Sequence, residues 1–134
     1  MINGKTTKQG FTIIELIIVA TIAGLLFVFF FIQKSNLDAL ARDEDRKTAI
    51  NAMYYALEEN FFKTNGYYPE TISEENITVI DPALWTDPDG HNLGDPKSSY
   101  SYRPANCNNG KCKEYTLKAD LEKEADFIKT NRKN

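Results

Sequence analysis

The sequence predicts an α+β protein in which one long N-terminal α-helix packs on a small antiparallel β-sheet head. Three features indicate this fold: an uncharged apolar run near the N-terminus, an apolar stripe with helical spacing after it, and a tight-turn signal between two alternating segments near the C-terminus. The 134 residues suffice for one small domain with an accessory segment. The predicted divisions of the chain are residues 1–10, 11–32, 33–65, 66–122 and 123–134.

The charge balance argues against several function classes. Lys and Arg total 16 and Asp and Glu total 19, so the net charge is −3. This balance is not typical of proteins that coat nucleic acid, and we expect no specific nucleic-acid partner. The basic tail formed by Lys129, Arg132 and Lys133 is too short to change that interpretation. His91 is the single histidine, so the sequence offers no His cluster for zinc and no His-based triad, and we do not expect an enzyme.

Residues 16–32 read LIIVATIAGLLFVFFFI and carry no charge. Together with residues 11–15 they make about 22 residues, or roughly 33 Å of helix, which matches a hydrocarbon core of about 30 Å. Lys5 and Lys8 in the polar segment before this run favour a cytoplasmic N-terminus and a translocated head. A cleavable signal peptide is disfavoured, because the small residues lie in mid-run and LLFVFFFI continues past them.

Glu15 lies near the start of this predicted membrane segment. An ionisable side chain is costly in hydrocarbon, so a plain anchor should not contain one. The carboxylate can be tolerated if it faces a cation, or if it stays at the level of the lipid headgroups and remains hydrated. Both interpretations are open from the residues alone.

The stretch GFTIIEL at residues 10–16, with a short basic leader before it and an uninterrupted apolar helix after it, resembles the type IV prepilin signal. Type IV pilins share this signal with the pseudopilins of type II secretion and DNA-uptake machines. The resemblance implies that a prepilin peptidase cuts between Gly10 and Phe11 on the cytoplasmic face and N-methylates Phe11. It also implies a single-pass anchor in the inner or cytoplasmic membrane with an extracytoplasmic head, and later an extracellular pilus or pseudopilus.

The function that the resemblance implies is a structural filament subunit, polymerised through its N-terminal helix and needing no cofactor. Its partners would be other pilin subunits in a homo- or heteropolymer, the membrane and, indirectly, an assembly platform and ATPase. Glu15 would accept the new amine of Phe11 from the next protomer, although pairing within one subunit is also open. The alternative function is a singly anchored extracytoplasmic ligand-binding module, which predicts no processing at Gly10 and no polymer.

The helix is predicted to continue to about Asn65, because residues 33–65 contain neither Gly nor Pro and Asn65-Gly66 is a stop signal. An apolar stripe should pack on the head: Ile50, Met53, Tyr54, Leu57 and Phe61. The mixed-charge run RDEDRK at residues 42–47 is interpreted as a solvated helix face, or as electrostatic matching between stacked subunits. Many pilins carry a proline near the position of Ile32, and in assembled pili their helix tends to unwind between a glycine and that proline. This sequence has Gly24 but no such proline, so the resemblance does not carry local melting over to this chain.

Residues 71–99 are rich in Asp, Pro, Gly and Ser and are predicted to form mostly turns, with ITVI at residues 77–80 compatible with one short strand. The expected core contacts in this segment are Ile77, Val79, Ile80, Leu84 and Trp85. Carboxylates around flexible glycines make Asp87, Asp89 and Asp95 weak calcium candidates, although turn chemistry alone explains them.

A β-hairpin with a tyrosine-rich face on the helix is predicted around Asn109-Gly110. Its alternating residues are Tyr100 and Tyr102 before the turn and Tyr115, Leu117, Ala119 and Leu121 after it. Cys107 and Cys112 flank the turn, and a translocated head favours a disulfide between them, with a stabilising effect of about 2 kcal/mol. Residues 123–134 are expected to form a short helix around Phe127-Ile128 or to be disordered.

Overall fold

The computed structural model describes residues 10–132. The chain divides into two compact units, Met1–Leu37 and Asp38–Asn134, and helix α1 (Ile13–Tyr55) contributes residues to both. The predicted α+β class, with a long N-terminal helix and small antiparallel sheets, is confirmed. Lys5, Lys8 and Lys133 lie outside the described residues, as does the predicted leader before Gly10.

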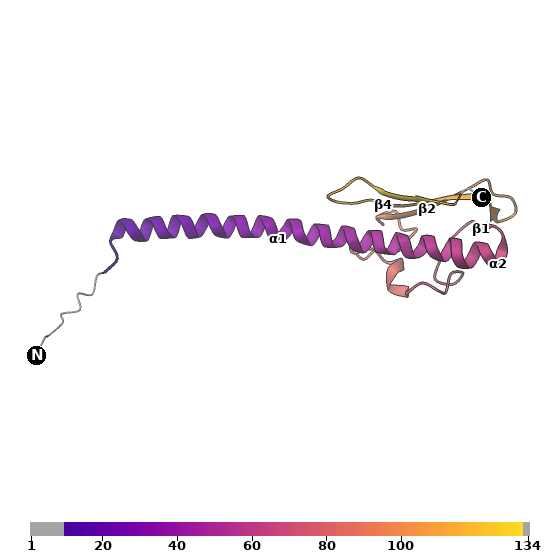
Figure 1. Cartoon of the computed structure of the whole chain (residues 1–134), viewed down its shortest axis with the longest axis horizontal. Coiled ribbons are helices and arrows are strands. Elements are labelled where there is room, and N and C mark those ends of the chain that lie inside the picture. The colour runs from indigo at the N-terminus through magenta and orange to yellow at the C-terminus, as the bar shows by residue number, and fades with distance from the viewer. Residues whose placement is uncertain (1–9, 133–134) are drawn as a thin grey trace, which may run out of the picture. The chain divides into compact units, whose positions relative to one another are not determined.

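In the first unit, α1 is continuous through Gly24 and Ile32. Its ribbon is unbroken in Figure 1. No proline interrupts the ladder of backbone hydrogen bonds in this stretch. The hydroxyl of Thr21 donates to the carbonyl of Ile17 at 2.8 Å, so this polar side chain is satisfied within the helix itself. The segment is therefore helical throughout in the single chain.

In the second unit, α1 passes into a π-helix, η1 (Ala56–Phe62), and then into a last short turn, α2 (Lys63–Asn65). The predicted end at Asn65-Gly66 is confirmed: Gly66 has φ 74°, a left-handed conformation that glycine adopts at little cost, and its N–H donates to the carbonyl of Phe62 at 2.7 Å. The π-helix was not predicted, because apolar spacing alone does not distinguish a widened turn from an α-helical one.

Two antiparallel sheets belong to the second unit. Strands β2 (Tyr100–Ala105), β4 (Glu114–Ala119) and β5 (Phe127–Thr130) form the first sheet in the order β2-β4-β5, and β1 (Tyr68–Pro69) pairs with β3 (Lys111–Cys112) in the second. In Figure 1 the larger sheet lies on one side of the helix and the 3₁₀ turn η2 (Pro82–Trp85) on the other. The pairing of β2 with β4 confirms the predicted hairpin.

Two local predictions were wrong. Residues 127–130 form strand β5 instead of a short helix or a disordered tail, because β4 offers its second edge to their backbone groups. Residues 77–80 form no strand, because the side chain of Asn76 ties this segment into a turn by accepting from the Ser73 N–H at 2.9 Å and donating to the Thr71 carbonyl at 2.7 Å.

The core forms between the helix and the sheets as predicted. Ile50, Met53 and Leu57 are fully buried, and Tyr54 and Phe61 pack partly against them. Of the residues expected from the turn-rich segment, Ile77, Ile80 and Trp85 are buried and Leu84 is partly buried. Val79 is the exception: 61% of its surface is exposed, so its predicted place in the core was wrong.

The mixed-charge run at residues 42–47 is not simply a solvated helix face. Asp43 and Arg46 are 1% and 2% exposed. Arg46 donates to Asp43 at 3.0 Å and to Asp89 and Glu122 at 2.7 Å each, while the backbone N–H groups of Glu122 and Lys123 donate to Asp43. Loops far along the chain supply the partners that make this burial tolerable. Electrostatic matching between subunits stays a prediction for the exposed charges of this run.

A second buried carboxylate, Glu58, lies within η1 and is 5% exposed. It accepts hydrogen bonds from the Tyr115 hydroxyl at 2.7 Å, from the Tyr68 hydroxyl at 3.1 Å and from the backbone N–H of Arg132 at 3.3 Å. Burial, reinforced by the nearby Glu58 carboxylate, raises the pKa of Tyr68 and Tyr115 well above the ordinary tyrosine value. The helix, β1, β4 and the chain after β5 therefore meet at one side chain.

The head is expected to lose stability as the pH rises above about 10. Burial raises the pKa of Tyr100 to about 12 and those of Tyr68, Tyr102 and Tyr115 further, whereas unfolded tyrosines titrate near 10. The unfolded chain therefore releases these protons first, and the stabilisation is complete below about pH 10 and lost as the pH climbs toward the folded-state values. Urea unfolding of the full chain in detergent at about pH 8 and about pH 11 measures this loss.

A matched pair of variants separates this effect from the titration of lysines in the same range. Tyr115→Phe should reduce the loss of unfolding free energy at alkaline pH. Tyr55→Phe, a substitution at an exposed tyrosine, should leave that loss unchanged. Equal losses in both variants would contradict the assignment to the buried tyrosines.

Candidate processing and assembly site

The N-terminal candidate site lies where the chain enters α1. Gly10, Phe11 and Thr12 precede the helix, which begins at Ile13. The Thr12 side-chain oxygen accepts a hydrogen bond from the N–H of Glu15 at 3.3 Å, and its carbonyl accepts one from the N–H of Leu16 at 3.1 Å. Thr12 is therefore the N-cap of the helix, and Glu15 is the third helical residue.

Sequence reasoning missed the role of Thr12. The signal was present, because Thr12-Ile13-Ile14-Glu15 has the spacing of a capping box, in which a threonine is followed three residues later by a glutamate. A carboxylate in the first helical turn also interacts favourably with the helix dipole. Glu15 thus stabilises the start of its own helix, in addition to any contact that it makes with another molecule.

The predicted cleavage position is exposed and outside regular structure. Phe11 is 78% exposed, and it lies before the first helical turn instead of within it. A Cβ atom added to Gly10 would meet nothing within 4 Å, so the packing of this chain does not itself require glycine at that position. Gly10, Phe11 and Glu15 all lie in this one short segment at the start of the helix.

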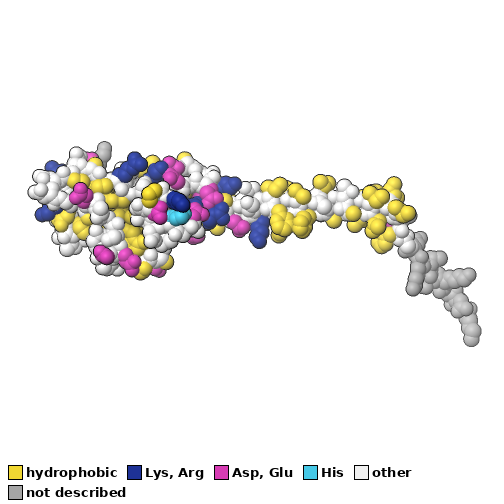
Figure 2. Space-filling model, turned by 180° about the vertical axis from the view of Figure 1, so that it is seen from behind, with side chains coloured by type: hydrophobic (Ala, Val, Ile, Leu, Met, Phe, Trp, Pro, Cys, Tyr) yellow, Lys and Arg dark blue, Asp and Glu magenta, His cyan; other side chains and the backbone are white. Residues whose placement is uncertain are grey.

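The helix that follows presents an apolar surface along residues 13–32. Every side chain in this range is exposed, and its large hydrophobic residues have between 52% (Ile22) and 82% (Ile13) of their surface accessible. Figure 2 shows hydrophobic side chains along this segment. The most apolar window has a mean hydropathy of 2.8, and the helix is long and apolar enough to cross a membrane. Such a surface requires lipid or other apolar helices around it.

A family model described as the prokaryotic N-terminal methylation motif matches residues 5–31. The chain carries the type IV pilin and pseudopilin signature. No curated protein and no solved structure matches the chain. The signature supports a type IV pilin-like subunit processed by a prepilin peptidase, and the proteins that share this motif are structural subunits. Together with the apolar helix, the signature fits a membrane-anchored protein.

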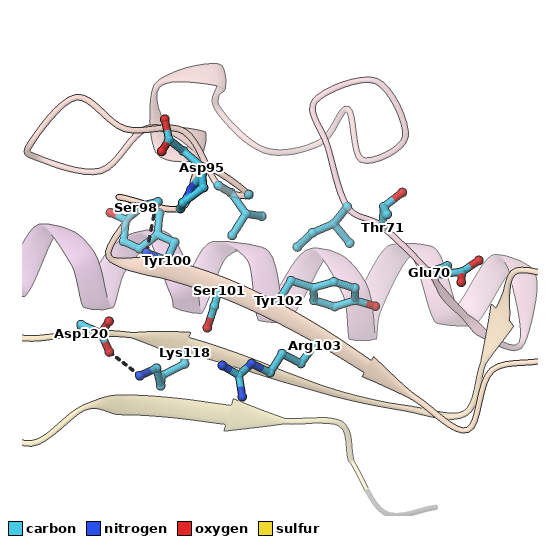
Figure 3. Close-up of a pocket in the computed structure, with 14 residues that line it drawn as sticks. Glu70, Thr71, Asp95, Ser98, Tyr100, Ser101, Tyr102, Arg103, Lys118 and Asp120 are labelled. Carbon is cyan, nitrogen blue, oxygen red and sulfur yellow. Dashed lines mark hydrogen bonds and ion pairs between the residues drawn. The ribbon is translucent and has the colours of Figure 1, made fainter.

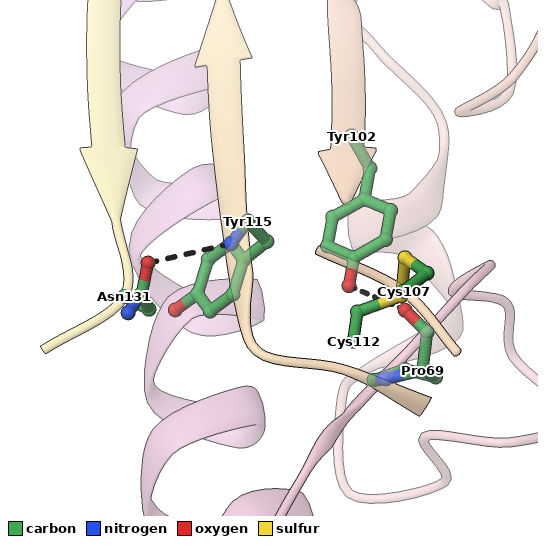
Figure 4. Close-up of a disulfide and its surroundings, with 6 residues drawn as sticks. All are labelled: Pro69, Tyr102, Cys107, Cys112, Tyr115 and Asn131. Atoms are coloured by element: carbon green, nitrogen blue, oxygen red, sulfur yellow. Dashed lines mark hydrogen bonds between the residues drawn. A yellow bond between two sulfur atoms is a disulfide. The ribbon is translucent and has the colours of Figure 1, made fainter. Parts of the chain in front are cut away.

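The head of this pilin-like chain contains the predicted disulfide between Cys107 and Cys112. Cys107 is exposed in the connection between β2 and β4, whereas Cys112 is fully buried on β3. Because β3 pairs with β1, the disulfide links the β2–β4 connection to strand β1, which follows the long helix. The Tyr102 hydroxyl donates a 2.7 Å hydrogen bond to the carbonyl of Pro69 in β1 (Figure 4). The turn at Asn109-Gly110 therefore leads into β3 and not directly into β4.

The weak calcium candidates of the pilin-like chain are engaged with protein donors. One oxygen of Asp87 accepts from the N–H groups of Asp89 and His91, and the other accepts from the N–H and hydroxyl of Ser99. Burial would raise the pKa of Asp87, but these donors bring it below its ordinary value. Within residues 10–132 no three acidic, His or Cys side chains form a group that could hold a metal ion. Calcium binding at Asp87, Asp89 and Asp95 stays a prediction.

Proposed function

We propose that the chain is a structural subunit of a type IV pilus or a related pseudopilus, and that it polymerises through its N-terminal helix. One observation carries this proposal: the methylation motif at residues 5–31 extends into helix α1, and the apolar side chains of α1 at residues 13–32 are all exposed in the single chain. A filament of such helices would bury this surface, as lipid does before assembly.

In this proposal a prepilin peptidase cleaves between Gly10 and Phe11 and methylates the new amine. The packing of this chain does not require glycine at position 10, because an added Cβ atom would meet nothing within 4 Å. Glycine instead lets an extended backbone enter the active site of the peptidase. Methylation of the amine leaves its positive charge in place. Phe11 then begins the mature chain with a cation, just before the capped first turn of α1.

Glu15 would receive that cation from a neighbouring protomer. Among residues 10–132, no donor is hydrogen-bonded to the Glu15 carboxylate; the contact with Thr12 uses the backbone N–H of Glu15. Both carboxylate oxygens are therefore available to an incoming ammonium. Pairing two opposite charges in an apolar filament core is far less costly than burying either charge alone.

Mass analysis of the N-terminus tests this function. The protein is recovered from sheared surface material of its natural host and, separately, from membranes. We expect the sheared fraction to contain a mature chain that starts at N-methylated Phe11. If the protein occurs only in membranes, with an intact Met1 N-terminus, the filament role is wrong and the singly anchored ligand-binding module is the better description.

A further inference from the structure

Strand β2 is one edge of the three-stranded sheet, and no strand in the described part of the chain pairs with its other side. The N–H of Asp120 donates to the Ser99 carbonyl at 2.8 Å, and the N–H of Lys113 donates to the Ala105 carbonyl at 3.3 Å. Backbone groups alternate in direction along an antiparallel strand, so the N–H and C=O of Tyr102 and the C=O of Tyr100 point away from β4. The N–H of Tyr100 donates to the Ser98 side chain and is already used.

A groove of about 400 Å³ runs beside this free edge. One wall is formed by β2 at residues 100–103, and the other wall by residues 70–72, 93–96 and 98 (Figure 3). Ile72, which is buried in the core, and Leu93, which packs against the core, line the groove, so part of its lining is apolar. The groove thus combines open backbone donors and acceptors with an apolar contact surface.

The groove also contains an unneutralised cation. Arg103 is exposed, and no residue in the described part of the chain accepts a hydrogen bond from it or forms an ion pair with it. Lys118, on the neighbouring strand, differs because it pairs with Asp120 and with Asp126. Three carboxylates also line the groove: Asp120 pairs with Lys118, and Glu70 and Asp95 lie on the opposite wall. A ligand carboxylate would therefore find its counter-charge only beside Arg103 on β2, and not elsewhere in the described lining.

We propose that this groove binds an extended peptide segment that adds a strand to β2 and places a carboxylate opposite Arg103. In an antiparallel arrangement with the acidic residue opposite Arg103, the peptide residue opposite Tyr102 exchanges two backbone hydrogen bonds with Tyr102. The residue opposite Pro104 donates a third to the Pro104 carbonyl, which by the same alternation points away from β4. Pro104 offers no N–H, which shortens the paired stretch at that end.

Side-chain alternation defines the chemistry of the peptide. Residues opposite Tyr102 face the same side of the sheet as Tyr102, toward the apolar lining, whereas the residue opposite Arg103 faces the outer side. The site is therefore complementary to an acidic residue flanked by apolar ones. An acidic sugar could satisfy Arg103, but it would not use the backbone groups along β2. This binding does not depend on cleavage at Gly10 or on polymerisation.

The test uses the full chain in detergent micelles and fluorescein-labelled acetylated pentapeptides, with fluorescence anisotropy as the readout. The first probe is TVEVT, the second is TVKVT, and the third is TVEVT with both valine amides N-methylated. We expect saturable binding of TVEVT, binding at least about 10-fold weaker for the N-methylated peptide, which loses two backbone hydrogen bonds, and about 3- to 5-fold weaker for TVKVT. Because these changes are in the peptide, folding of the protein does not affect them.

A pair of protein variants adds a charge test. Arg103→Glu should reverse the preference between TVEVT and TVKVT, whereas Lys113→Glu, an equal change outside the groove, should not. The proposal is wrong if N-methylation leaves the affinity unchanged, if no peptide saturates up to about 10 mM, or if both variants shift the preference alike. It is also wrong if free glucuronate displaces TVEVT as effectively as unlabelled TVEVT does, which would identify an acidic-sugar site.

Discussion

Replacement of Glu15 by alanine is expected to leave cleavage at Gly10 intact and to abolish incorporation into filaments. The variant still presents Gly10 and Phe11 in an exposed segment before the helix, so the peptidase meets an unchanged cleavage position. The new Phe11 amine of the neighbouring protomer would then enter an apolar environment without a partner. Removing one member of a buried ion pair typically costs about 3–5 kcal/mol, so association should weaken by about 150- to 5000-fold.

Processing and assembly can be measured on the same cultures. Mass analysis of membrane fractions reports cleavage and methylation, and the amount of protein in sheared filaments reports assembly. Processing that fails together with assembly would show that Glu15 acts earlier, toward the peptidase.

Two control variants distinguish the charge from other properties of Glu15. Glu15→Gln keeps a polar side chain that can stay hydrated at the headgroup level but removes the negative charge, and we expect it to fail in assembly as alanine does. Thr12→Ala removes the helix cap but keeps the carboxylate, at a cost of about 1 kcal/mol to the first turn, and it should still assemble. Normal filaments from Glu15→Gln would exclude pairing of charges as the role of this residue.

Replacement of Arg46 by methionine is expected to lower the free energy of unfolding of the head by about 3–5 kcal/mol. The substitution removes a buried cation and leaves Asp43, which is 1% exposed, without its ion-pair partner. It also cuts the links from the helix to Asp89 and Glu122. Urea unfolding of the full chain in detergent, followed by the fluorescence of the buried Trp85, measures the change.

Arg42 offers a matched control, because it pairs with the same Glu122 carboxylate at 2.6 Å but its side chain is 38% exposed. Exposed ion pairs contribute about 0–1 kcal/mol, so Arg42→Met should have a small effect. Equal destabilisation by the two substitutions would contradict the importance of the buried network.

The acid limb of the stability curve provides a second readout of the same network. Burial would raise the pKa of Asp43, but the N–H donors of Glu122 and Lys123 and the guanidinium of Arg46 bring it below its ordinary value. Hydrogen bonds from Arg42 and Arg46 lower the pKa of Glu122 to about 2. The stabilisation from both acids is therefore present above about pH 4.5 and is lost as the pH falls toward the folded-state values. Arg46→Met should make this acid loss shallower.

The parts of the fold that follow from local pattern were predictable. The apolar run predicted the long N-terminal helix, the spacing of Ile50, Met53 and Leu57 predicted the buried helix face, and Asn109-Gly110 predicted the hairpin. Each of these signals lies within a few residues of the chain, and each has one dominant structural outcome.

The parts that depend on distant partners were not predictable. A charged pair such as Asp43 and Arg46 gives the same pattern on a solvated helix as on a buried one, and the difference lies in Asp89 and Glu122, many residues away. Strand β5 is short and forms only because β4 leaves an edge open to it. At the N-terminal site, the motif indicated Gly10, Phe11 and Glu15, and the cap at Thr12 was missed although its capping-box spacing stands in the sequence.

The unbroken helix from Gly24 to Ile32 has a mechanical consequence for a filament built from this chain. Unwinding these nine residues would lengthen each subunit by about 17 Å, since an extended chain advances about 3.4 Å per residue and a helix about 1.5 Å. Without a proline, every turn in this stretch keeps its hydrogen bonds, and stretching would have to break them one after another. Such a filament would resist extension under load, and a proline substituted at Ile32 would be the direct way to make it compliant.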